Sequence, residues 1–181
     1  YSIEELIPYI DWNPFFAVWQ LRGKYPNRNY PNIFNDETVG SQAKSTFEDA
    51  QTMIRDLCKS KSLQARGIVG FYPANTDSSN IDDIVLYTDE SRKSEIARFH
   101  GLRQQAQKED NSPYLALSDF VAPNDSGVAD YLGMFACSAG FGCEALSQQF
   151  LAKLDDYRSI MVKALADRFA EAMDEKLHHD I

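Results

Sequence analysis

A carboxylate beside several large rings stands near the start of the chain. Asp11 lies within residues 9–16, whose sequence is YIDWNPFF. A carboxylate next to aromatic faces suits a cationic ligand, which it can hold by a charge-assisted hydrogen bond and a cation–π contact. The same aspartate can instead cap a helix while the rings fill the core, because Asp is a preferred N-cap residue. Residue types alone favour the cap, and one carboxylate can serve both roles.

A second group of charges lies near the C-terminus. Residues four apart share one face of a helix, and the chain has such a ladder in Lys163, Asp167, Glu171 and Glu175. A charge ladder of this kind is usually a solvated face. It therefore predicts no chemistry without further information.

A glycine pattern resembles a nucleotide-binding turn. Residues 140–145, with the sequence GFGCEA, match the GxGxxA pattern. A dinucleotide fold needs a second parallel strand after the next helix, whereas here the helical pattern continues to the end of the chain. We therefore interpret these glycines as a turn from a strand into a helix. The spacings GxxxxGK[ST], GxSxG and HExxH do not occur.

The cysteines and histidines predict neither a metal site nor a disulfide framework. The cysteines form no CxxC pair, and adjacent histidines on a helix point about 100° apart, so they cannot share one ion as an i,i+4 pair can. An odd number of cysteines is typical of a reducing compartment, so we expect a cytoplasmic protein. The residues concerned are Cys58, Cys137, Cys143, His100, His178 and His179.

Composition and charge exclude several classes of protein. The chain has 181 residues, of which 44% are hydrophobic and 25% are charged, as in one ordinary globular domain. Its formal net charge of -9 repels phosphate backbones and anionic membranes. The apolar runs are far shorter than the roughly 20 residues that span a bilayer. We therefore expect no nucleic acid and no membrane as partner.

Three stretches carry helical signals. Asp11 and Asn13 can cap a helix at residues 14–21, and apolar positions spaced by three and four predict helices at 40–60 and 144–178, the latter with a break near Asp155. Residues 22–36 predict a loop anchored by Tyr25, Tyr30 and Phe34. Alanines in the final helix predict that it packs on more than one side; they are Ala164, Ala166, Ala170 and Ala172.

The middle of the chain predicts strands. The β-branched and aromatic runs 68–72 and 84–87 predict a pair of strands around the turn-forming residues 75–80. Two similar runs, 114–121 and 131–137, predict further strands on either side of a break at 122–127. Residues 95–105 fit a helix or a strand, and their type stays open.

The sequence also resembles a known family. The start of the chain and several later segments closely resemble the activation domain of cobalamin-dependent methionine synthase, in the same order. These segments span nearly the whole chain, and several long motifs in one order are far more specific than one short motif. They are YIDW at 9–12, PFF at 14–16, WQLRGKYP at 19–26, RGIVGFYPAN at 66–75, LRQQ at 102–105, SDFVAP at 118–123, and IMVKALADR at 160–168 with AEA at 170–172.

The resemblance implies an α+β fold, with a twisted antiparallel sheet flanked by helices and a long C-terminal helix. It also implies a function as part of methionine synthase, the 5-methyltetrahydrofolate–homocysteine methyltransferase. In that family the domain binds S-adenosylmethionine and presents its methyl group to a cobalamin oxidised to the cob(II)alamin state. A flavodoxin-like reductase supplies one electron, and the cob(I)alamin that forms is remethylated. The cobalamin is held by a neighbouring domain.

Site residues follow from the resemblance position by position. Asp11 resembles the family's S-adenosylmethionine-binding aspartate, and Glu171 resembles a second carboxylate of that site. Lys24 resembles a lysine on the surface that meets the cobalamin domain. Carboxylates suit the ligand because it carries a sulfonium and an ammonium. No catalytic residue and no metal ligand is expected in this chain.

The chain departs from the family in one large respect. The family continues past the long helix for roughly another hundred residues, including an Arg-Pro-x-Pro-Gly-Tyr loop that has no counterpart here. We therefore expect residues 1–181 to form a single, C-terminally incomplete activation domain that, by itself, binds S-adenosylmethionine weakly or not at all. Two alternatives stay open: a stand-alone, non-catalytic interaction module that docks a corrinoid or flavin protein, and an activator acting on another corrinoid protein.

Overall fold

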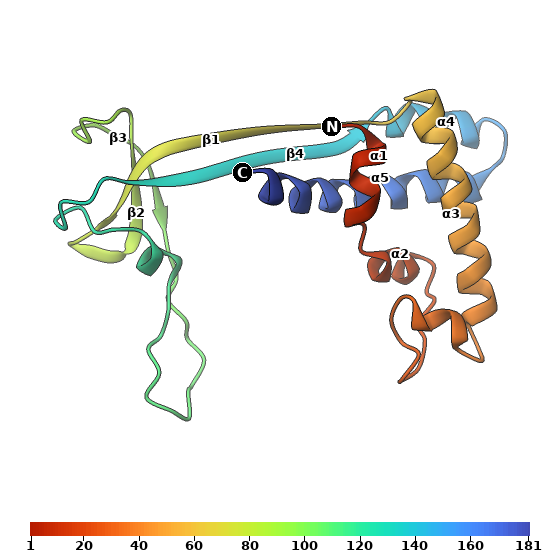
Figure 1. The fold of residues 1–181 in the computed structure, drawn as a ribbon, viewed down its shortest axis with the longest axis horizontal. Helices are drawn as coiled ribbons and strands as arrows, with labels where there is room; N and C mark the ends of the chain where they lie inside the picture. Colours follow the sequence, from red (N-terminus) through yellow and green to blue (C-terminus); the bar gives the residue numbers. More distant parts are fainter. The chain divides into compact units, whose positions relative to one another are not determined.

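The computed structural model describes all residues from 1 to 181 and contains helices and one sheet (Figure 1). The chain begins with helices, continues through strands β1 to β4 and ends with helices. The elements in order are α1 (Ile3–Leu6), the 3-10 helix η1 (Ile7–Tyr9), α2 (Trp12–Val18), η2 (Asn32–Asn35), α3 (Gly40–Ser60), β1 (Gln64–Asp77), β2 (Asn80–Tyr87), β3 (Glu95–His100), η3 (Leu117–Phe120), β4 (Asp130–Phe141), α4 (Cys143–Leu151) and α5 (Asp156–Asp180).

The four strands form one antiparallel sheet in the order β3-β2-β1-β4. β1 and β2 pair with Ala74 opposite Leu86, and β2 and β3 pair with Ile84 opposite Phe99. The predicted α+β fold, with an antiparallel sheet and a long C-terminal helix, is confirmed. Residues 95–100, whose type the sequence left open, form strand β3.

The chain divides into two compact units. The first unit comprises Tyr1–Ile68 and Ala136–Ile181, and the second comprises Val69–Phe135. β1 and β4 have residues in both units. All three residues that the resemblance assigns to the site belong to the first unit.

Helix α5 is the centre of the first unit. Helices α1, α2, α3 and α4 and the 3-10 helix η1 all contact it. Its fully buried side chains include Leu165, Phe169 and Met173, and Cys137 of β4 donates its thiol to the carbonyl of Ala170 at 3.6 Å. The prediction that this helix packs on more than one side is confirmed.

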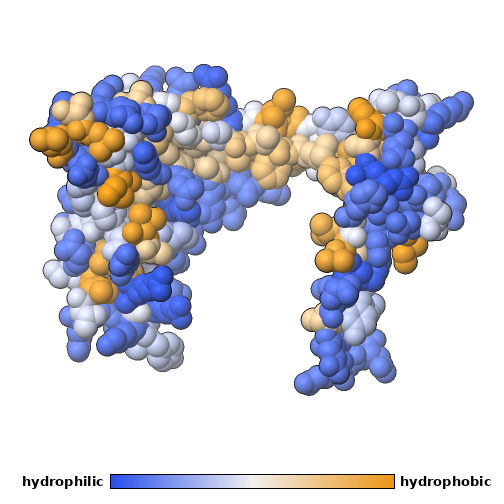
Figure 2. All heavy atoms as spheres, turned by 180° about the vertical axis from the view of Figure 1, so that it is seen from behind, coloured by the Kyte–Doolittle hydropathy of each residue, from blue (hydrophilic) through white to orange (hydrophobic).

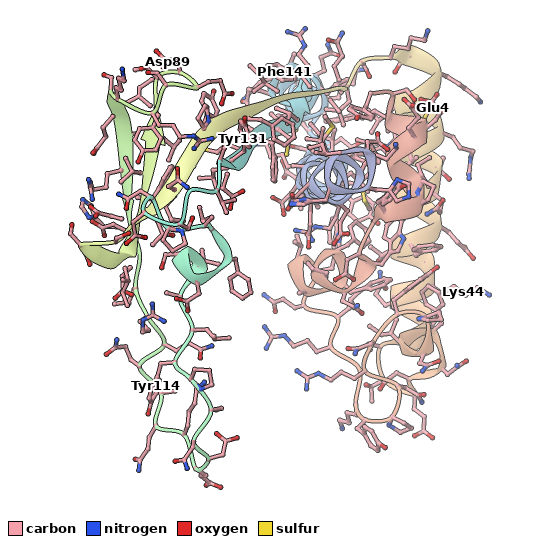
Figure 3. The ribbon with its side chains drawn as sticks, turned by 60° about the vertical axis from the view of Figure 1, so that its left-hand side comes forward. Glu4, Lys44, Asp89, Tyr114, Tyr131 and Phe141 are labelled. Atoms are coloured by element: carbon pink, nitrogen blue, oxygen red, sulfur yellow. The ribbon has the colours of Figure 1, made fainter.

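Helix α3 shows the two faces that its periodicity predicts. Ala43, Ala50 and Ile54 are buried, whereas Lys44 projects outward from the helix (Figure 3). The helix ends at Lys61, which adopts a left-handed conformation with φ 52° and donates its N–H to the carbonyl of Leu57 at 2.9 Å. This segment therefore forms as predicted, from Gly40 to Ser60.

The second unit has a small core on one face of its strands. Ala74, Ile84 and Leu86 are buried there, with Val121 and Leu132 packed against them. Several large apolar side chains stay exposed, and Figure 2 shows hydrophobic patches scattered over an otherwise hydrophilic surface. The most exposed in this unit are Leu102, Leu117 and Phe120.

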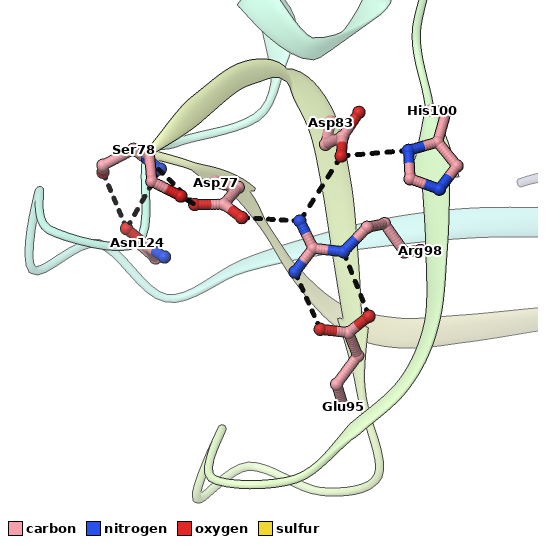
Figure 4. A network of polar contacts seen from close by, with 8 residues as sticks. Asp77, Ser78, Asp83, Glu95, Arg98, His100 and Asn124 are labelled. Atoms are coloured by element: carbon pink, nitrogen blue, oxygen red, sulfur yellow. Dashed lines mark hydrogen bonds and ion pairs between the residues drawn. The ribbon is translucent and has the colours of Figure 1, made fainter.

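A polar network ties three strands of this unit together (Figure 4). Arg98 of β3 pairs with Asp77 at 2.5 Å, with Asp83 at 3.4 Å and with Glu95 at 2.8 Å. His100 Nδ1 lies 3.0 Å from Asp83 Oδ2 and extends the network along β3. The surrounding carboxylates, Glu95 first, raise the pKa of Arg98 above its ordinary value. The guanidinium, which is charged at all ordinary pH values, holds β3 to β2 and β1.

Two local predictions are wrong. Residues 114–121 do not form a strand, because Leu117–Phe120 is a 3-10 helix whose turn lets the Asp119 carboxylate accept the N–H of Ala116 at 2.9 Å. Tyr25 does not anchor its loop, since it is 93% exposed.

The helix predicted at 14–21 begins earlier, at Trp12, and ends at Val18. The break near Asp155 is confirmed, and Asp155 caps α5.

No helix of the chain is both long enough and apolar enough to span a membrane.

Candidate ligand site

Asp11 occupies the N-cap position of α2. Its Oδ1 accepts the backbone N–H of Asn13 at 2.9 Å and the side-chain amide of Asn13 at 2.8 Å. The neighbouring rings of Trp12, Phe15 and Phe16 are buried, so they serve the core. The cap that the residue types favoured is present.

The other oxygen of Asp11 remains available. Oδ2 has no hydrogen-bond partner, and the residue is exposed. A carboxylate keeps about four lone-pair sites, so capping with one oxygen leaves the second able to accept a hydrogen bond from a cationic group. The cap and the ligand role are therefore compatible in this geometry.

Asn13 connects Asp11 to the loop that follows α2. While its amide donates to Asp11, its Oδ1 accepts the backbone N–H of Tyr30 at 2.8 Å. The ring of Tyr30 packs against Trp12, Phe16 and further rings of this unit, including Phe34 and Phe47. Asp11 is thus oriented by a side chain that is itself fixed by backbone and aromatic contacts.

Lys24 lies on this loop, and Asp36 fixes its backbone. Asp36 Oδ2 accepts the N–H of Lys24 at 2.8 Å, and Oδ1 accepts from the N–H and hydroxyl of Thr38 and from the N–H of Val39. These donors, with the N–H of Lys24 first, hold the pKa of Asp36 well below its ordinary value. The side chain of Lys24 is exposed and forms no ion pair.

Glu171 lies on the exposed side of α5 and is already paired. Its Oε2 accepts from the guanidinium of Arg168, which also pairs with Asp167 at 2.6 Å. The side chain of Arg168 is only 10% exposed, whereas that of Glu171 is 47% exposed. A buried charge requires a partner, so Asp167 and Glu171 together neutralise Arg168.

The structure brings the three predicted residues into one unit but not into contact. Asp11 and Lys24 belong to α2 and to the loop after it, and α2 packs on α5, which carries Glu171. None of the three side chains bonds to another. The ladder that includes Glu171 is a solvated face, as predicted, since Lys163, Asp167 and Glu175 are also exposed.

Two residues that orient the site were not identified from the sequence. Asn13 was considered only as a cap, although its spacing of two from Asp11 is typical of a local side-chain bond. Arg168 was not considered, although an Arg three residues before Glu171 is a common helical pair. The sequence signals exist, but burial of Arg168 makes its pairing obligatory, and burial is visible only in the structure.

The glycine pattern forms a turn between β4 and α4. Gly142 caps α4 with φ 96°, and a Cβ atom there would lie 2.1 Å from the carbonyl oxygen of Ser62. Glycine is therefore required by the backbone, as the interpretation of a strand-to-helix turn predicts.

The structure contains no cluster of three or more His, Cys, Asp or Glu side chains that could hold a metal ion. All three cysteines are free, and burial raises the pKa of each thiol above its ordinary value. Since the thiolate is the nucleophilic form, this shift disfavours nucleophilic chemistry at the three thiols.

Comparisons with known proteins give one consistent result. Residues 2–181 match the family model described as vitamin B12 dependent methionine synthase, activation domain. The chain is also similar to a solved structure described as the crystal structure of the MetH reactivation domain bound to AdoHcy, with 49% sequence identity and a TM-score of 0.86. The similarity covers 99% of this chain and 52% of the solved chain, so this chain spans about half the length of that structure.

Proposed function

This chain belongs to the activation-domain family of vitamin B12-dependent methionine synthase, and we propose that it forms part of a site for S-adenosylmethionine. When bound beside a reduced cobalamin, this ligand supplies the methyl group that returns the cobalamin to its methylated form. The solved relative at 49% identity is bound to AdoHcy, which supports an S-adenosyl ligand.

The observation that carries this proposal is the geometry of Asp11. One oxygen is held by Asn13, and the other is exposed and has no partner. A carboxylate fixed in this way loses little further side-chain freedom when a ligand binds. Its free oxygen can accept from the ligand's ammonium group, and its charge favours the sulfonium.

Glu171 is proposed as a second carboxylate of the site. Its side chain pairs with Arg168 and is 47% exposed, so a ligand can reach it. Because Asp167 also pairs with Arg168, Glu171 can turn toward a cation without leaving the buried guanidinium unpaired.

The remaining parts of the proposal concern the partners. Lys24 is proposed to face the neighbouring domain that holds cobalamin, since its side chain is exposed on a loop whose backbone is fixed by Asp36. A flavodoxin-like reductase is proposed as the electron donor. The residues of this chain then bind and orient the methyl donor, as part of a cytoplasmic methyltransferase, and take no part in electron transfer.

We further propose that residues 1–181 alone bind the ligand weakly. A micromolar site needs about 8 kcal/mol, whereas two charged hydrogen bonds contribute roughly 1.5–3 kcal/mol each before ordering costs. The missing contacts would come from the half of the solved relative that this chain does not cover.

A calorimetric titration with S-adenosylmethionine tests this proposal. It compares residues 1–181 with a fusion of these residues to the uncovered half of the solved relative. We expect heat of binding from the fusion and little from the shorter chain. Tight binding by residues 1–181 alone would show that the site is self-sufficient. No binding by a folded fusion would contradict the proposed function and favour a non-catalytic interaction module.

A further inference from the structure

A small cavity in the first unit lies between α2 and the loop that follows it. Its volume is about 210 Å³. One wall is apolar, and the remainder carries amides and guanidinium groups. The lining residues are Asn13, Phe16, Ala17, Leu21, Arg22, Arg28, Asn29 and Ile33.

The two arginines of this cavity have no partner. Neither Arg22 nor Arg28 forms a hydrogen bond, an ion pair or a ring contact. Every other arginine of the chain has a polar partner: Arg55 bonds Thr52, Arg66 bonds Gln64, Arg158 pairs with Asp155, and Arg92, Arg98, Arg103 and Arg168 all pair with carboxylates. Both arginines are exposed, so their guanidinium groups are open to a ligand from solution.

The cavity carries positive charge only. None of its lining residues is acidic, and both oxygens of Asp36, the carboxylate that fixes the loop, already accept hydrogen bonds from backbone and hydroxyl donors. Both guanidinium groups attract an anion that enters the cavity. Guanidinium donors match the geometry of carboxylate and phosphate oxygens.

The backbone that presents these arginines is fixed. The carbonyl of Lys24 accepts the N–H of Asn27 at 2.7 Å, and the side-chain amide of Asn27 donates to the carbonyl of Asn35 at 3.3 Å. A Cβ atom at Gly23 would lie 2.1 Å from the carbonyl oxygen of Asn27, so the tight turn between the arginines requires glycine. A fixed backbone lowers the ordering cost of binding.

We propose that Arg22 and Arg28 form a binding site for a small oxyanion, the phosphate or carboxylate group of a compact molecule. The apolar wall of Phe16, Leu21 and Ile33 can contact the body of that molecule, and the amide of Asn29 can donate to the anion. The net charge of -9 disfavours anions at long range. Binding must therefore come from short-range contacts in the cavity. The cavity shares Asn13 with the hydrogen bonds that hold Asp11, but its proposed ligand group is an anion, and the proposal does not depend on the proposed function.

The test uses inorganic phosphate and acetate as probes of residues 1–181. Resonances of the arginine Nε–Hε groups are followed by NMR at low ionic strength, because salt screens exposed charges. We expect saturable shifts at Arg22 and Arg28, with phosphate binding more tightly than acetate because a dianion can engage both guanidinium groups. The variants Arg22→Gln and Arg28→Gln should each weaken phosphate binding by about tenfold, the effect of losing one charged hydrogen bond.

The matched control is Arg55→Gln, which removes the same charge from an exposed position on α3. We expect this variant to bind phosphate like the unchanged chain. Shifts that do not saturate would contradict the proposal. So would an equal loss in all three variants, since that result reflects net charge alone. A stronger response to acetate than to phosphate would contradict the use of both arginines.

Discussion

Asn13 donates two hydrogen bonds to the same carboxylate oxygen of Asp11, one from its backbone N–H at 2.9 Å and one from its side-chain amide at 2.8 Å. The two oxygens of the Asp11 carboxylate therefore have different roles. Oδ1 begins helix α2, and Oδ2 remains open to solvent. The structural and the proposed ligand role of Asp11 can therefore be separated by substitution.

The capping role predicts different stabilities for two substitutions at Asp11. Asn is as good an N-cap residue as Asp, whereas Ala cannot cap. Asp11→Ala should lower the free energy of unfolding by about 1 kcal/mol, and Asp11→Asn should lower it by less than about 0.5 kcal/mol. Urea unfolding followed by tryptophan fluorescence measures this, since Trp12 and Trp19 both lie in the first unit. Equal losses would mean that charge, rather than the cap, stabilises the helix.

The glycines of the turn before α4 should differ in their tolerance of a side chain. Gly142→Ala places a Cβ atom against the carbonyl oxygen of Ser62 and requires a positive φ. Gly140→Ala meets only the Ser138 hydroxyl, at 3.8 Å. We expect a loss of more than about 1 kcal/mol in unfolding free energy for Gly142→Ala. The Gly140 variant should stay close to the unchanged chain. Similar losses at both positions would contradict the close approach of Gly142 to Ser62.

A buried pair of hydroxyls joins α4 and α5. Ser147 and Ser159 lie 2.8 Å apart, and both are buried. Replacing one serine by alanine leaves the other hydroxyl without its partner, at a cost of about 1–3 kcal/mol, whereas replacing both removes the unpaired group. Ser147→Ala and Ser159→Ala should therefore each destabilise the first unit, and the double variant should be no less stable than either. Additive losses in urea unfolding would show that the hydroxyls do not interact.

The ion pair of Arg103 with Asp119 predicts an acid-dependent loss of stability in the second unit. Arg103, followed by the N–H of Ala116, lowers the pKa of Asp119 to about 2. Because this folded pKa lies below the ordinary value of 3.8, the stabilisation is complete above that value and is lost as the pH falls toward about 2. Asp119→Asn should therefore lose less stability than the unchanged chain over this range.

Urea unfolding followed by circular dichroism at several pH values measures this difference. Asp125→Asn is the matched control, because Asp125 has no polar partner and should leave the acid dependence unchanged. A parallel decline in all three proteins would mean that Arg103 does not stabilise the charged form of Asp119.

Local periodicity predicted the elements that bury one continuous face. Residues 40–60 and helix α5 form as the apolar spacing indicates, since each buries an apolar stripe. Helix α4 also forms, but its only buried residue is Ser147, and Leu154 of the predicted stripe is 92% exposed. The run 114–121 misled because most of its apolar residues stay exposed, and Leu117 and Phe120 are among the most exposed in the chain. Hydrophobicity predicts a strand only where the run has a partner strand to bond.

The candidate site was predictable only in part. The residue types around Asp11 suggested both a helix cap and a carboxylate for a cationic ligand. The family resemblance added Glu171 and Lys24 as further site residues. The pairing of Glu171 with a buried Arg168 depends on how deeply α5 lies in the first unit. The cavity of Arg22 and Arg28 depends on a loop that folds back on α2. Such relationships arise from tertiary packing, which no local pattern contains.

The most direct test of the proposed function is the affinity of the fusion protein for S-adenosylmethionine with Asp and with Asn at position 11. Asn keeps the cap but removes the negative charge, so the fold is preserved while the attraction to the cationic ligand is lost. We predict that Asp11→Asn weakens binding by about tenfold or more with little change in unfolding free energy. Unchanged affinity in this variant would contradict a ligand role for Asp11 and leave it as a helix cap.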